Sequence, residues 1–279
     1  MNTSDLTLLP MARVEMVAID LDGTLLRSDK RLSKRVINAV TTVSNHGIRV
    51  VLASARPPRA VRQVYECLGL QTLQINYNGA LIQDPRRNRY LFHQPLETIL
   101  AQRLVRVARR TDRNVAVSIE ILDRWFTDRV DYDLPTETSR SLNPDFIGDL
   151  NAFLHVPVTK LMFLAPPDRL NRVRKEIQKR FCQQVMIHVS DKHLIQIVHP
   201  QVDKAMALAH VARRYNVIRQ NIMAIGDAPN DVGMLRFAGL GVAMGNAWEV
   251  TRSAADVVVP SNDEDGVMFA LHEYVLDRI

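Results

Sequence analysis

The chain has 279 residues, a formal net charge of +6 and 24% charged residues, values typical of a globular protein with a substantial core. No apolar run reaches the roughly 20 residues that a membrane span requires. Residues 1–10 lack a cationic segment before an apolar core, so we expect a short extension and no signal peptide. Cys67 and Cys182 have no metal-ligand spacing, and we expect buried thiols in a cytoplasmic protein.

Basic residues are concentrated in the segments 86–89, 103–113 and 169–180. Such a charge suits an anionic partner, either a small phosphorylated molecule or nucleic acid. The arginines of the second segment lie at helical spacing opposite Leu104 and Ala108, so a solvated helix face accounts for them. The sequence has no RNP-type aromatic motif and no zinc-finger spacing, and it therefore gives no support for nucleic-acid binding.

The first 80 residues alternate between expected strands and expected helices. Apolar runs predict strands at 14–19, 48–53 and 73–75. Ser33 and the Pro57–Pro58 pair begin the helices between them, which end at Gly47 and Gly69. This alternation is typical of βαβ units in a doubly wound parallel sheet.

The pattern changes after residue 82. The segments 81–82 and 90–92 flank a turn and predict a hairpin. We expect a helix from about residue 95, strands at 115–119 and 124–127, a polar loop at 128–144, a strand at 159–164, a helix at 168–181 and a strand pair at 185–189 and 194–198. Strands and hairpins with helices on one face indicate an inserted α+β module.

The alternation resumes with a helix at Lys204, strands at 221–225, 241–244 and 257–259, and a last helix from residue 266. We therefore predict an α/β protein with a doubly wound, Rossmann-like parallel-sheet core. Residues 1–82 and 199–279 would form this core, and residues 83–198 an inserted α+β cap that sets substrate specificity.

The apolar run at 17–19 ends in two carboxylates, Asp20 and Asp22. Because the side-chain period of a strand is two, both would point the same way at the carboxyl end, where open α/β sheets bind ligands. Such close like charges indicate a metal, a nucleophile beside an acid/base, or both. A solvated Asp-Gly turn is the alternative. A calcium EF-hand loop fits poorly, since its glycine comes later and a helix precedes it.

Other expected elements also begin or end in reactive residues. Ser54 follows the second strand, Lys204 begins a helix, and Asp227, Asn230 and Asp231 follow the strand at 221–225. Each alone has a plain structural explanation as a helix cap, a surface lysine or a turn. Because the carboxyl ends of parallel strands meet at one edge, we expect acids, a hydroxyl and an ammonium to share one crevice.

Together these motifs resemble the haloacid dehalogenase superfamily of phosphohydrolases, over nearly the whole chain from residue 14. The sequence is most similar to the Cof-type subfamily, whose α/β cap (type IIB) follows the third core strand. The resemblance rests on the segments 20–25, 53–57, 78–80, 226–227 and 230–231 and on residue 204, with further similarity at 243–247 and 262–267.

The resemblance implies a Mg²⁺-dependent phosphatase that forms an aspartyl-phosphate. Asp20 would attack phosphorus, and Asp22 would protonate the leaving oxygen and then activate water. Mg²⁺ would be held by Asp20, the backbone carbonyl of Asp22 and Asp227, with Asp231 in support.

Phosphate or substrate binding is implied for Ser54, Ala55, Asn78, Lys204 and Asn230, the last of which would orient the lysine or its neighbours. The chain departs from the family where Ser-Ala replaces Thr-Gly at 54–55, which keeps the hydroxyl but restricts the backbone. It departs again at residue 203, an aspartate that could compete for the ammonium of Lys204.

The expected partner is a small phosphorylated metabolite, with sugar phosphates favoured, and no membrane. A phosphomutase, a regulatory protein without catalysis and an RNA-associated protein are the alternatives. A nucleophile at Asp20 argues against a protein that only binds. Both a monomer and a homodimer remain open.

Overall fold

The computed structural model describes residues 13–136, 139–140 and 142–278, so the expected N-terminal extension lies outside the described residues. The chain forms two compact units. The first contains the described parts of Met1–Ala53, Val64–Leu73 and Lys204–Ile279, and the second those of Ser54–Gln63 and Gln74–Asp203. The boundaries expected for core and cap, after residues 82 and 198, stay a prediction.

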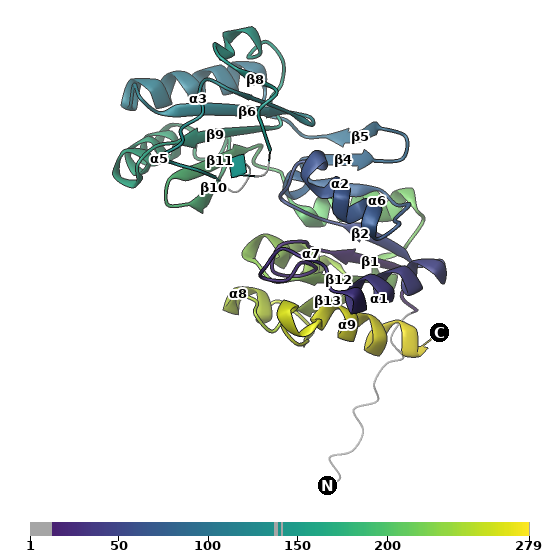
Figure 1. Ribbon diagram of the computed structural model, residues 1–279. Coiled ribbons are helices and arrows are strands. Elements are labelled where there is room, and N and C mark those ends of the chain that lie inside the picture. Colours follow the sequence, from purple (N-terminus) through teal and green to yellow (C-terminus); the bar gives the residue numbers. More distant parts are fainter. Residues whose placement is uncertain (1–12, 137–138, 141, 279) are drawn as a thin grey trace. The chain divides into compact units, whose positions relative to one another are not determined.

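A five-stranded parallel sheet forms the centre of the first unit (Figure 1). Its order is β14 (Val257–Val258), β13 (Leu240–Ala243), β12 (Ile222–Gly226), β1 (Met16–Ile19) and β2 (Arg49–Leu52). Every residue of β1 and β12 is buried, as expected for strands covered on both faces. The fold therefore places the ends of β1 and β12 side by side.

Helices of the first unit flank this sheet. They are α1 (Lys34–Asn45), α6 (Lys204–Arg214), α7 (Val232–Phe237), α8 (Glu249–Arg252) and α9 (Gly266–Tyr274), and α2 (Pro58–Cys67) has residues in both units. Helix α1 packs with α9, and α6 with α7. Ser33 caps α1 as expected, because its hydroxyl accepts a hydrogen bond from the Val36 amide at 3.1 Å.

The second unit contains a six-stranded sheet that carries two helices on one face. The strand order is β10 (Met186–Asp191), β11 (Leu194–Val198), β9 (Lys160–Leu164), β6 (Ala116–Ile121), β7 (Arg124–Thr127) and β8 (Phe146–Ile147). Helices α3 (Thr98–Thr111) and α5 (Pro167–Phe181) supply Leu104 and Val173 to a core that also contains Phe163 of β9. The expected α+β module is thus present.

The strand expected at 73–75 belongs to a different sheet from the one predicted. Strand β3 (Gln74–Asn76) pairs antiparallel with β4 (Leu81–Asp84), which pairs with β5 (Arg89–His93). The short 3₁₀ helix η1 (Tyr77–Gly79) reverses the chain directly after β3, and such a tight reversal favours antiparallel pairing. The expectation of a third parallel strand was therefore wrong.

The predicted burial of the two cysteines was wrong, whereas the predicted exposure of arginines in α3 is confirmed. Cys67 and Cys182 are exposed, so the prediction of buried thiols was wrong: they lie at the C-terminal ends of α2 and α5, on the solvent side. Arg106 and Arg110 of α3 are exposed opposite buried Ala108, as expected for a solvated face.

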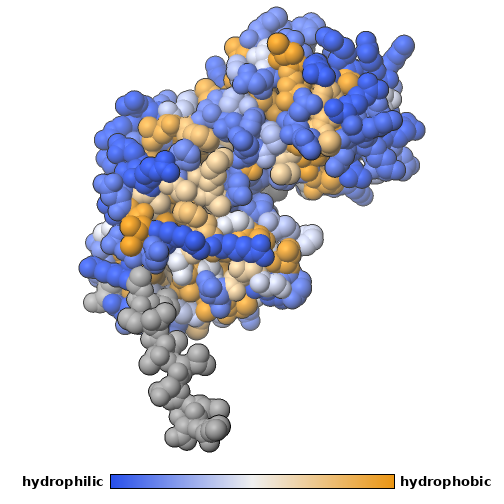
Figure 2. Space-filling view, turned by 180° about the vertical axis from the view of Figure 1, so that it is seen from behind, coloured by the Kyte–Doolittle hydropathy of each residue, from blue (hydrophilic) through white to orange (hydrophobic). Residues whose placement is uncertain are grey.

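Figure 2 shows hydrophilic side chains over much of one face of the molecule, with apolar groups between them. No helix among the described residues is long and apolar enough to cross a membrane.

Candidate active site

The two central strands of the parallel sheet deliver a carboxylate each. Asp20 follows β1 and Asp227 follows β12, and the Asp20 amide donates to the Ile225 carbonyl at 3.0 Å. Both side chains are nearly buried, with 5% of Asp20 and 8% of Asp227 exposed. The expectation that strand ends would bring these acids together is confirmed.

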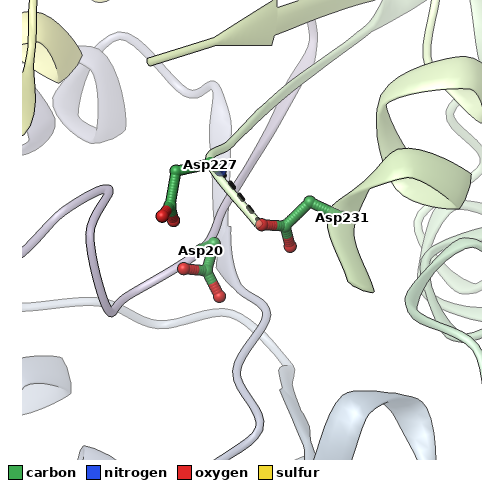
Figure 3. A group of neighbouring side chains, drawn as sticks. All are labelled: Asp20, Asp227 and Asp231. Atoms are coloured by element: carbon green, nitrogen blue, oxygen red, sulfur yellow. Dashed lines mark hydrogen bonds between the residues drawn. The ribbon is translucent and has the colours of Figure 1, made fainter. Parts of the chain in front are cut away.

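Asp231 completes a group of three carboxylates (Figure 3). One carboxylate oxygen from each of Asp20, Asp227 and Asp231 lies within 4.8 Å of the others. Asp231 Oδ2 accepts hydrogen bonds from the amides of Asp227 (3.1 Å) and Ala228 (3.0 Å). A Cβ at Gly226 would lie 2.5 Å from the Asp231 Cβ, so only glycine allows this close approach.

Lys204 supplies the positive charge of the cluster. It is 1% exposed, and its Nζ donates to Asp20 Oδ1 at 2.5 Å and to Asp231 Oδ1 at 2.7 Å. Burial opposes its ionisation, but the two carboxylates outweigh burial and raise the pKa of Lys204. The lysine is therefore a fixed ammonium at the first residue of α6.

Three carboxylates around one ammonium leave an excess of negative charge. Burial, together with repulsion from Asp231, raises the pKa of Asp20 well above its usual value even though Lys204 lowers it. Burial also raises the pKa of Asp227 to about 6, with Asp22 and Asp231 adding to the shift and the bond from Thr24 opposing it. The site thus favours a proton or a cation beside these acids.

The donor atoms of the cluster fit a hard divalent cation. Asp20 Oδ2 and Asp227 Oδ2 accept no hydrogen bond from the described residues, whereas both Asp231 oxygens do. Carboxylate oxygens are the ligands that Mg²⁺ prefers, usually one or two with water and phosphate. Asp20 and Asp227 could therefore bind the ion directly, and Asp231 would orient its neighbours.

Asp22 lies in the loop after Asp20, where its carboxylate accepts a hydrogen bond from Lys30 Nζ at 2.8 Å. Its side chain is 35% exposed, so water reaches this carboxylate, in contrast to those of Asp20 and Asp231. The following residue, Gly23, has a φ of +81°, and a Cβ there would lie 2.4 Å from Asp227 Oδ2. Glycine is required in this loop for both reasons.

The remaining predicted residues are not all part of the carboxylate cluster. Ser54, Ala55 and Asn78 belong to the second unit, where the Asn78 amide donates to the Ser54 carbonyl at 3.0 Å. The Ser54 side chain is 1% exposed and accepts from the Arg56 amide at 3.1 Å. Asn230 lies half-buried in the 3₁₀ helix η4 (Pro229–Asp231) of the first unit. Their roles in binding phosphate stay predictions.

No role was predicted for three polar residues that support the cluster, although Thr24 and Asn246 lie in the segments that carry the resemblance. Thr24 Oγ1 donates to Asp227 Oδ1 at 2.9 Å, Lys30 binds Asp22, and Asn246 Nδ2 donates to the Gly23 carbonyl at 2.8 Å. The position of Thr24 directly after the Asp-x-Asp-Gly motif was a usable signal. Lys30 carried no such signal, because a lysine in a polar loop is usually solvated.

Comparisons with known proteins give the family. A model described as haloacid dehalogenase-like hydrolase matches residues 17–271, and the chain belongs to this family. A 5-amino-6-(5-phospho-D-ribitylamino)uracil phosphatase of Bacillus subtilis is 29% identical over 263 residues, 93% of this chain and 97% of the relative. Another phosphatase of the same organism is 31% identical over 283 residues, 91% of this chain and 97% of its own.

A solved structure supports the same assignment. A haloacid dehalogenase-like hydrolase from Bacteroides thetaiotaomicron superimposes with a TM-score of 0.86 at 27% identity, covering 93% of this chain and 99% of its own. These comparisons confirm the predicted superfamily, the α/β fold class and the assignment to the phosphatases.

Proposed function

We propose that the protein is a Mg²⁺-dependent phosphatase that hydrolyses phosphomonoesters of small metabolites through an aspartyl-phosphate. The observation that carries the proposal is the cluster of Asp20, Asp227 and Asp231 around Lys204, with its excess of negative charge. A resident divalent cation would offset this excess. The same cation would also attract the negatively charged phosphate of a monoester substrate.

The first step transfers the phosphoryl group to the enzyme. A carboxylate oxygen of Asp20 forms a bond to phosphorus as the bond to the leaving oxygen breaks. The Asp22 carboxyl gives its proton to the leaving oxygen, which departs as an alcohol. Asp20 then carries the phosphoryl group as an acyl-phosphate.

The second step releases phosphate. The Asp22 carboxylate takes a proton from water as the water oxygen bonds to phosphorus, and the bond from phosphorus to Asp20 breaks. This returns Asp20 to its carboxylate and Asp22 to its acid form. Inorganic phosphate and the alcohol are the only products, and no further reactant is consumed.

Several groups would hold the phosphoryl oxygens. Bound Mg²⁺, on the side chains of Asp20 and Asp227 and the Asp22 carbonyl, would supply positive charge to those oxygens. The Lys204 ammonium and the Ser54 hydroxyl would donate hydrogen bonds to them. A fixed ammonium suits this role, because it needs no reorganisation as charge develops.

The substrate class we favour is a sugar or polyol phosphate, bound in part by the inserted module. The Bacillus relative is named for a phosphorylated ribityl compound, which supports a polyol phosphate as the ester. Specificity would then lie in residues 83–198, outside the groups that do the chemistry.

A phosphate-release screen tests the proposal directly. The full chain would be incubated with Mg²⁺ and a panel of sugar, polyol and nucleoside monophosphates, with Asp20→Asn as the matched control. We expect release of inorganic phosphate from a subset of the panel, none with Asp20→Asn, and none in excess EDTA. A product that is an isomeric phosphate, without release of inorganic phosphate, would show a mutase instead.

A further inference from the structure

The second unit buries a second cluster of charged side chains, centred on Glu120 of β6. Glu120 is 0% exposed, and its Oε2 accepts hydrogen bonds from Arg59 Nη2 at 3.0 Å and from the Tyr77 hydroxyl. Its Oε1 lies 3.1 Å from Lys160 Nζ of β9, which also lies 5.0 Å from the Tyr77 ring centroid. One carboxylate thus joins three elements of the unit.

The cluster extends to the turn between β6 and β7. The backbone amide of Arg59 donates to Asp123 Oδ1 at 2.9 Å, and its Nη1 lies 3.3 Å from the same oxygen. The Tyr77 hydroxyl also lies 2.7 Å from the Leu122 carbonyl. Burial and the charge of Glu120 raise the pKa of Tyr77, so the hydroxyl keeps its proton as a donor. Arg59 is thus held through both its backbone amide and its guanidinium, and Tyr77 is held through its hydroxyl.

The residues held by this cluster have strained backbones. Tyr77, Asn78 and Leu122 have φ of 52°, 58° and 55°, in the left-handed region. This region is costly for residues with a Cβ, and for an aromatic residue in particular. Such conformations persist only where surrounding bonds fix them, and they are common at functional sites. The hydrogen bond that the Tyr77 hydroxyl donates to Glu120 fixes Tyr77 in this way.

The strained segment in turn holds the loop that carries Ser54. The Asn78 amide donates to the Ser54 carbonyl at 3.0 Å, and the Tyr77 amide donates to the Arg56 carbonyl at 3.3 Å. Asn76 Nδ2 donates to the same Arg56 carbonyl at 3.1 Å. A continuous series of hydrogen bonds therefore runs from Ser54 to Glu120.

We propose that Glu120 and Tyr77 are positioning residues for phosphate binding: they fix the strained turn at 77–78 and, through it, the orientation of Ser54. The inference rests on the proposed function, because it takes Ser54 as the hydroxyl that binds phosphoryl oxygens. The stability of the fold is a weaker explanation for this cluster. A buried ion pair is often replaced by apolar side chains without loss of stability, whereas its geometry can fix one arrangement.

Tyr77→Phe is the decisive variant, because it removes one hydroxyl and keeps the ring beside Lys160. We expect kcat/KM for a good phosphomonoester to fall about tenfold, and the combination with Ser54→Ala to fall no further than Ser54→Ala alone. Such non-additivity shows that Tyr77 acts through Ser54. Glu120→Gln should give the same pattern, with a larger loss of stability because Arg59 and Lys160 lose their shared anion.

Ser118→Ala is the matched control. It removes a different buried hydroxyl, that of Ser118 in β6, which donates to Thr127 Oγ1 at 2.7 Å and lies two residues from Glu120. It should lower the melting temperature without changing kcat/KM. Equal effects of Ser118→Ala and Tyr77→Phe on kcat/KM would overturn the proposal, as would simple multiplication of the Tyr77→Phe and Ser54→Ala losses.

Hydrogen exchange separates this proposal from the proposed function. Tyr77→Phe should speed exchange of the Asn78 amide, which is bonded to Ser54, while Ser118→Ala should leave it unchanged. If the wild-type protein released no phosphate from any ester, the proposed function would fail and the exchange result would still judge the hydrogen-bond series. Unchanged exchange at Asn78 in Tyr77→Phe would overturn the positioning role by itself.

Discussion

The two units each bury a cluster of charged side chains, and the clusters differ in charge balance. In the first unit, Asp20, Asp227 and Asp231 share the single ammonium of Lys204. In the second unit, by contrast, the single carboxylate of Glu120 meets two cations, Arg59 and Lys160. Asp20 and Glu120 are both buried, so the difference between these two carboxylates lies in the opposite charges beside them.

The pKa directions of Asp20 and Glu120 record this difference, whereas burial raises the pKa of Asp123 despite its bonds to Arg59. Burial and neighbouring acids raise the pKa of Asp20. For Glu120, burial acts in the same direction, but Lys160 and Arg59 outweigh it, and the net result is a lowered pKa. A buried carboxylate with sufficient cationic partners stays ionised and holds those partners in place, whereas one with too few favours a bound proton or cation. The predictions below test this distinction.

The largest effect is expected for the two carboxylates that follow β1, Asp20 and Asp22. Asp20→Asn removes the attacking charge, so turnover should fall by about 10⁴-fold or more and no acyl-phosphate should form. Asp22→Asn keeps the nucleophile but loses the proton donor and later base, a loss of about 10²–10⁴-fold. With p-nitrophenyl phosphate the loss should be smaller, because that leaving group needs little protonation.

Trapping with labelled substrate measures the difference between these two variants. The aspartyl-phosphate should persist longer in Asp22→Asn than in wild type, since water then lacks its base, and should be absent in Asp20→Asn. Equal labelling of the two variants, or label on another residue, would refute the assigned roles.

The second prediction compares the two buried lysines. Lys204 is the only cation that pairs with Asp20 and Asp231 in the described part of the chain, so for Lys204→Met we expect a loss of about 3–5 kcal/mol in the free energy of unfolding. Lys160→Met should cost less, because Glu120 keeps Arg59 at 3.0 Å. Urea unfolding of the metal-free proteins measures both. A larger loss for Lys160→Met would contradict the charge-balance argument.

Much of the first unit follows from local sequence patterns. The strands β1 and β12 are apolar runs, each followed by an aspartate, and the carboxyl ends of strands in a parallel sheet meet at one edge. The convergence of Asp20 and Asp227 follows from that arrangement alone. The residues next to Lys204 in the sequence do not distinguish it from a surface lysine. Its place in the site could be predicted only because other reactive residues were expected at the same sheet edge.

The second unit shows where sequence reasoning stops. Strand β3 has three residues, too few to show an alternation of apolar and polar side chains. The turn that follows it decides which strand it pairs with. Glu120 lies in a strand whose other residues are mostly apolar, and its ion pair with Arg59 joins residues 61 positions apart. No local pattern encodes such a pair, so the cluster became visible only with the tertiary structure.

The third prediction concerns pH and metal. Because the pKa of Asp227 is raised from 3.8 to about 6, the folded metal-free protein holds a proton there that the unfolded chain releases. Stability should therefore fall as pH rises through this window. Mg²⁺ at 100 times its Kd should restore about 2.7 kcal/mol at pH 8, and less at pH 5, where protons compete.

Asp227→Asn tests that prediction, because it removes the penalised charge and can still accept from Thr24. Its metal-free melting temperature at pH 8 should exceed that of wild type, and Mg²⁺ should no longer raise it. Glu66→Gln, at an exposed acid of the same unit, should behave as wild type in both measurements. A wild-type response to Mg²⁺ in Asp227→Asn would exclude this residue as a ligand.

The smallest effect is expected for the exposed pair beside the site. Lys30 and Asp22 are bonded at 2.8 Å, but their side chains are 50% and 35% exposed, so water competes for both. Lys30→Gln should change the free energy of unfolding by less than about 1 kcal/mol, far less than Lys204→Met. Urea unfolding at low and high salt measures this, and salt should shrink the difference further. A loss comparable to that of Lys204→Met would contradict the view that burial decides how much such an ion pair contributes to stability.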